Sequence, residues 1–202
     1  MKKINLLTLG VSLTALFYAC NSGTDGSGKA ADSVTTLSST DTLTPYDSAT
    51  TVHNAADTAS NPVIVFATKA GAGSLMEIQL GELSQVSAEN KRVRDFGAMV
   101  LKDHKEASES LNAIATAKHI IIPSTLPVKI QGHVNQMKNL KGAEFDKHYI
   151  DMMVKDHKED IKLFEEASKN AKDAEIKAFA AKTLPVLKKH LDSATAIKKI
   201  LK

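Results

Sequence analysis

Apolar residues recur every three to four positions along the chain from Pro62 onward, which is the spacing of one face of an α-helix. The pattern predicts four long helices and one short helix, over residues 63–86, 89–118, 128–140, 143–170 and 174–200. Ser87 and Asp173 are expected to cap the second and the last long helix, and Pro185 is expected to kink the last one. Long amphipathic helices joined by short turns pack as an antiparallel bundle. The sequence therefore predicts one all-α domain, a four-helix bundle with a short connecting helix, over residues 62–202.

The composition supports helices over sheets and argues against one class of partner. The chain has no Trp, three Tyr and six Phe, so its core must be mostly aliphatic and rich in Ala. Its net charge of +3 falls to +1 if Lys2 and Lys3 are removed with a signal peptide. Such a balanced charge does not indicate a nucleic-acid partner, and we expect none.

The first twenty residues, MKKINLLTLGVSLTALFYAC, resemble a bacterial lipoprotein signal. Two lysines precede an apolar run that is too short to cross about 30 Å of hydrocarbon, and the run ends at Cys20, the only cysteine. We expect a signal peptide over residues 1–19, and a lipidated Cys20 with a flexible Ser/Thr/Asp-rich tether over residues 20–61. The expected location is the cell envelope, lipid-anchored at the outer membrane, with either membrane face left open.

A short motif occurs twice, as MVLKDHKE at residues 99–106 and as MVKDHKE at residues 153–159. His104, His157 and His190 each lie on the apolar face of a different predicted helix, and Glu77 is the acidic residue nearest the inner face of the first helix. If the helices converge, these four residues form a possible metal site suited to Zn, Fe, Cu or Mn. A metal-free network of buried His and Glu side chains would use the same residues.

The aspartates of the repeated motif lie about 100° around the helix from the neighbouring histidines. Asp103 and Asp156 therefore either accept hydrogen bonds from a histidine of another helix or are solvated, and solvation is the favoured interpretation. Motifs of phosphate loops, nucleophile elbows and zinc proteases do not occur in the sequence, and Glu-x-x-His pairs typical of di-iron bundles are missing at the three histidines. Binding is therefore favoured over catalysis.

Three stretches together resemble a bacterial domain family of unknown function whose members are often labelled predicted outer membrane proteins. They are DFGAMVLKDH, GAEFDKHYIDMMVKDHKEDIKLFEEAS and FAAKTLPVLKKHLDSA. The resemblance covers about residues 62–201 and implies an exported, ferritin-like four-helix bundle with recurring polar positions at Glu77, His104, His157 and His190. Three functions follow as hypotheses: a lipid-anchored metal-binding bundle, a structural or protein-interaction module, and, less favoured, a metal-dependent oxidoreductase. Protein partners are unknown, and a homodimer is left open.

Overall fold

A computed structural model describes residues 61–201 of the chain. The predicted signal peptide, Cys20 and nearly all of the predicted tether lie outside the described residues. Five helices account for most of the described part, and their bounds are α2 Pro62–Ser87, α3 Lys91–Ala117, α4 Val128–Lys138, α5 Gly142–Asn170 and α6 Ala174–Ile200. The prediction of four long helices and a short connecting one is confirmed.

Polar residues that satisfy free backbone N–H groups set most of the helix starts. The Asn61 side chain accepts a hydrogen bond from the Val63 N–H, and Pro62 occupies the first turn of α2, where it has no N–H to leave unpaired. Asp173 accepts from two N–H groups at the start of α6, as predicted. The predicted cap at Ser87 is wrong. Asn90 caps α3 instead, because the chain turns through residues 88–90 before the helix begins.

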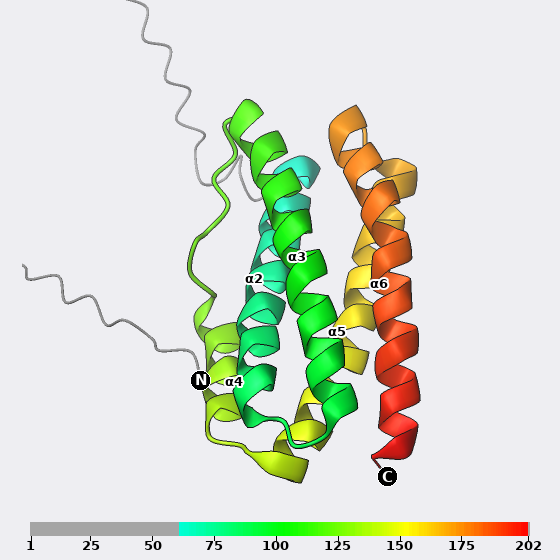
Figure 1. The fold of residues 1–202 in the computed structure, drawn as a ribbon. Coiled ribbons are helices and arrows are strands. Elements are labelled where there is room, and N and C mark those ends of the chain that lie inside the picture. Colours follow the sequence, from blue (N-terminus) through cyan, green and yellow to red (C-terminus); the bar gives the residue numbers. More distant parts are fainter. Residues whose placement is uncertain (1–60, 202) are drawn as a thin grey trace, which may run out of the picture. The chain divides into compact units, whose positions relative to one another are not determined.

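The four long helices form two antiparallel hairpins, α2 with α3 and α5 with α6 (Figure 1). The segment 118–127 leaves the end of α3 and returns along the bundle to α4, which lies against α2 and α5. In cross-section α2 and α6 occupy opposite corners, because each of them contacts both α3 and α5. One long crossover between two hairpins is the connectivity of ferritin-like bundles, so the predicted fold class is confirmed.

Helix α2 is apolar on nearly all sides. It is the only helix in the described part of the chain that is long and apolar enough to span a membrane by composition. Three other helices contact it, and Ile120 and Ile122 of the crossover pack against the same apolar cluster as Phe66 of α2. A helix covered on several sides needs no polar face. The position of α2 in the bundle therefore accounts for its composition.

Two apolar clusters fill the bundle, one toward each end. One contains Phe96, Phe145 and Tyr149, and the other contains three aromatic rings in contact, in which Phe66 meets Phe164 and Phe179 edge to face. Polar side chains that are almost fully buried lie between these clusters. Pro185 lies within α6, which is continuous through this residue, so the predicted kink stays a prediction.

Candidate metal centre

Each long helix contributes one of the four predicted side chains to the middle of the bundle. Glu77 comes from α2, His104 from α3, His157 from α5 and His190 from α6. Three of them are completely buried, and His104 is 4% exposed. The structure therefore brings together the four residues that helical periodicity selects.

On the side of α2 and α3, His104 contacts two polar side chains. Its Nδ1 lies 3.1 Å from Ser74 Oγ, and its Nε2 lies 3.0 Å from Glu77 Oε2. Although Glu77 Oε1 is also only 3.2 Å from His157 Nδ1, neither carboxylate oxygen has the alignment of a regular hydrogen bond. Glu77 thus keeps unused acceptor capacity in a site that excludes water.

On the side of α5 and α6, two imidazoles face each other directly. His157 Nε2 lies 3.1 Å from His190 Nδ1, and the other nitrogen of His157 lies 3.0 Å from the carbonyl oxygen of Met153. The second nitrogen of His190, Nε2, lies 2.9 Å from Asp103 Oδ2. Asp103 is therefore the acceptor for a histidine of another helix, and the favoured prediction that it is solvated is wrong.

These contacts form one continuous chain of polar side chains that crosses the bundle. Its members, in spatial order, are Ser74, His104, Glu77, His157, His190 and Asp103. A donor atom from each of the three histidines lies within 4.8 Å of the other two, which is a separation that a shared ion can bring together. Glu77 contacts two of the rings but is not a member of that mutual set.

Burial favours the uncharged form of every group at the centre. Burial raises the pKa of the Glu77 carboxyl well above its usual range, and the charges of Asp160 and Asp156 raise it further. Burial lowers the pKa of His157 to about 4, with a smaller contribution from His190. The pKa of His104 is lowered well below the usual value, also mainly by burial. Burial also lowers the pKa of His190, although the hydrogen bond to Asp103 partly offsets this. The three imidazoles are therefore neutral near pH 7, which is the form that binds metals.

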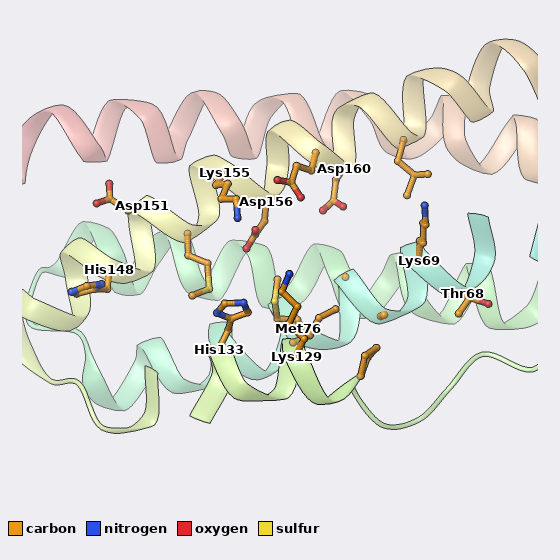
Figure 2. A pocket seen from close by; sticks show the side chains of 17 residues that line it. Thr68, Lys69, Met76, Lys129, His133, His148, Asp151, Lys155, Asp156 and Asp160 are labelled. Atoms are coloured by element: carbon orange, nitrogen blue, oxygen red, sulfur yellow. The ribbon is translucent and has the colours of Figure 1, made fainter. Parts of the chain in front are cut away.

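A groove of about 820 Å³ opens beside the centre, between α2, α4 and α5. Figure 2 shows Asp156 and Asp160 of α5 projecting into it toward α2. Both aspartates are half-buried, and Asp156 Oδ2 is buried without a hydrogen-bond partner among the described residues. Asp156 is thus only partly solvated, because it lies in a groove between α2, α4 and α5, and it contacts no histidine of another helix among the described residues.

The family model described as a domain of unknown function (DUF4142) matches residues 48–197. The chain belongs to this family. The DUF4142 chain is also similar in fold to a solved structure, the DUF305 fragment from Deinococcus radiodurans, with a TM-score of 0.62 and 8% identity over 69% of this chain and 97% of that one. A search of curated proteins found no match. At so low an identity, the likeness supports the fold alone.

Ser74 and Asp146 were not predicted to support the centre, and the contact of Asp103 with a histidine of another helix was the less favoured of two expectations. Ser74 lies one turn before Glu77 on the same side of α2, a signal that helical spacing could have supplied. The contact of Asp103 depends on which helix neighbours α3, and periodicity does not contain that information. Asp146 accepts hydrogen bonds from the N–H groups of Glu89 and Asn90, so it fixes α5 to the turn between α2 and α3. It serves the scaffold of the site, not its chemistry.

Proposed function

We propose that the DUF4142 domain binds a transition-metal ion through His104, His157 and His190, with Glu77 and Asp103 orienting the rings. The surroundings of His157 carry the proposal. The acceptor at its Nδ1 is the Met153 carbonyl oxygen, at 3.0 Å.

An acceptor also lies at the other nitrogen of His157. A carboxylate only accepts hydrogen bonds, so His190 donates to Asp103 from its Nε2 and presents a lone pair at Nδ1. That lone pair faces His157 Nε2 at 3.1 Å. A neutral imidazole has a single N–H, so His157 cannot satisfy acceptors on both of its sides.

One pair of acceptors is therefore left face to face whenever His157 and His190 are both neutral. A second proton on either ring would remove the conflict, but burial lowers the pKa of both rings, that of His157 to about 4. A metal ion that accepts the lone pairs of His157 Nε2 and His190 Nδ1 also removes it. The His157 N–H then donates to Met153, and the His190 N–H donates to Asp103.

The donor set fits a borderline metal. Two bonds of about 2.1 Å join donors up to about 4.2 Å apart on one ion. His157 Nε2 and His190 Nδ1 are 3.1 Å apart, which is within that limit. The donor atoms of all three histidines lie within 4.8 Å of one another, so the rings must move slightly closer together to share one ion. Imidazole nitrogens suit Zn, Fe, Cu and Mn in different degrees, so the donor types support a metal of this group without selecting one.

The test is the metal content of the full chain, expressed without a His tag and measured by mass spectrometry before and after incubation with each ion. We expect near one ion per chain, and its loss in the H104A/H157A variant. The matched control is H133A/H148A, which removes two exposed histidines and should keep the metal. Absence of metal in the wild type, together with an H104A/H157A variant that only unfolds more easily, would favour the metal-free core network instead.

We also propose that the chain is anchored in the cell envelope by a lipid on Cys20. The basic start, the short apolar run and the single cysteine that follows Ala19 support this assignment. Metabolic labelling with a fatty-acid probe should modify the wild type and leave a Cys20→Ser variant unlabelled. Recovery of both proteins in the same soluble fraction, without label, would contradict the anchor.

A further inference from the structure

We propose that metal cations reach the three histidines through the groove between α2, α4 and α5, guided by Asp156 and Asp160. This inference rests on the proposed metal site and adds its route of uptake. A bundle with a buried centre has several faces through which an ion could pass. The position of the groove and the charge of its lining favour this face.

The groove lies against the residues that hold the centre. Asp156 precedes His157, and Asp160 follows it by three residues on the same helix. On α2, Met76 lines the groove directly beside Glu77. The groove therefore borders the two helices that carry Glu77 and His157, and its lining includes the sequence neighbours of both residues.

The sign of the charge near the bottom of the groove suits a cation. Asp156 and Asp160 are half-buried, whereas the lysines that line the groove, Lys69, Lys129 and Lys155, are exposed. A carboxylate in a partly enclosed, low-dielectric position acts more strongly on a nearby ion than an exposed ammonium group that water screens. Among the described residues, neither aspartate forms a salt bridge that would cancel its charge.

Glu77, at the centre, is a third carboxyl group that supports this route. It is completely buried, and neither of its oxygens accepts a regular hydrogen bond. Three carboxyl groups with unused acceptor capacity thus lead from the groove to His104 and His157.

The opposite face offers a poorer route. A smaller depression of about 330 Å³ between α3 and α6 is lined by Asp103, whose carboxylate is already hydrogen-bonded to His190. Lys182 and Lys189 line this depression too, and its other acid, Glu106, forms a long salt bridge of 3.8 Å to Lys102. A cation therefore meets fewer free carboxylates on this face.

The experiment measures the rate of Co²⁺ uptake by the metal-free full chain in a stopped-flow instrument, through the visible absorption of the bound ion. The D156N/D160N variant should load about five- to tenfold more slowly at low salt and bind the same amount of Co²⁺ at equilibrium. Its rate should also depend less on ionic strength than that of the wild type. The control E106Q/E109Q removes two exposed negative charges from α3 and should load at the wild-type rate.

A second variant tests the route without changing charge. Gly73 lines the groove, and a Cβ built on it would lie 3.6 Å from Asp160 Oδ1, an ordinary contact distance. The Cβ of a larger residue therefore fits, and Gly73→Leu should fill part of the groove and slow loading. Equal rates in the wild type, D156N/D160N and G73L would overturn the route while leaving the metal site intact. Loss of stoichiometric Co²⁺ binding in D156N/D160N would show that the aspartates are metal ligands, and this result would also overturn the proposed route. If the wild type binds no ion, the proposed function itself fails.

Discussion

The tight contact between α2 and α3 at Gly97 allows a test of how the site is held. A Cβ on Gly97 of α3 would overlap Ser84 Oγ of α2 and would lie 2.8 Å from the Ser84 Cβ. Seven residues away on each helix, in the same antiparallel register, His104 meets Glu77 at 3.0 Å. Any substitution that pushes α2 and α3 apart at Gly97 should therefore also lengthen the contact between His104 and Glu77.

The expected effect of Gly97→Ala on stability is the balance of three contributions. Alanine in a helix interior is favoured over glycine by about 1 kcal/mol. Overpacking a well-filled contact costs about 1–3 kcal/mol, and displacing Ser84 would break its 2.7 Å hydrogen bond to the Gly81 carbonyl oxygen, at about 1 kcal/mol. The net result is a loss of about 1–3 kcal/mol in the free energy of unfolding.

The matched control is Gly132→Ala in α4, where an added Cβ has no neighbour within 4 Å. This variant should gain about 0.5–1 kcal/mol, because only the helix preference of alanine remains. Urea unfolding followed by far-ultraviolet circular dichroism measures both changes, since the chain has no Trp to report by fluorescence. In a Ser84→Gly background the loss caused by Gly97→Ala should shrink. A Gly97→Ala protein as stable as the Gly132→Ala protein would refute the reasoning.

Three further predictions concern the core, the scaffold and the response to pH. Phe164→Ala removes one ring of the buried aromatic trio and should cost about 3–5 kcal/mol by urea unfolding; a loss below 1 kcal/mol would mean that the site refills. Asp146→Ala removes two hydrogen bonds to backbone N–H groups and should cost about 2 kcal/mol, whereas a change near zero would show that water replaces the carboxylate. Burial raises the pKa of Asp156 to about 6 and that of Asp160 to about 7, from a usual 3.8. The folded state binds these two protons more tightly than the unfolded state, so the wild type loses stability as the pH rises from about 4 toward 7. The free energy of unfolding of D156N/D160N should therefore rise relative to that of the metal-free wild type over that range. A difference independent of pH would contradict the shifts.

Much of the fold and the middle of the site could be predicted, because buried residues recur every three to four positions along an amphipathic helix. His157 and His190 recur in phase with the apolar residues of their own helices, so their inward direction follows from the sequence. Asp103 is out of phase with His104 and was expected in water, yet it reaches the ring of His190. Its environment depends on the neighbouring helix α6, and neighbours are set by tertiary packing. The partial burial of Asp156, in the groove between α2, α4 and α5, depends on tertiary packing in the same way.

The division of the centre between the two hairpins has a consequence for how cooperatively the domain holds together. Glu77 and His104 belong to α2 and α3, while His157 and His190 belong to α5 and α6, and the crossover is the only covalent link between these halves. An ion held by all three imidazoles would add metal bonds to the apolar contacts and the Asp146 hydrogen bonds that already join the two hairpins. The metal-free chain should let its hairpins part transiently, with amide exchange at the facing helices faster than global unfolding. With an ion bound, those amides should exchange only through global unfolding. Metal binding would then make the two hairpins unfold as one cooperative unit.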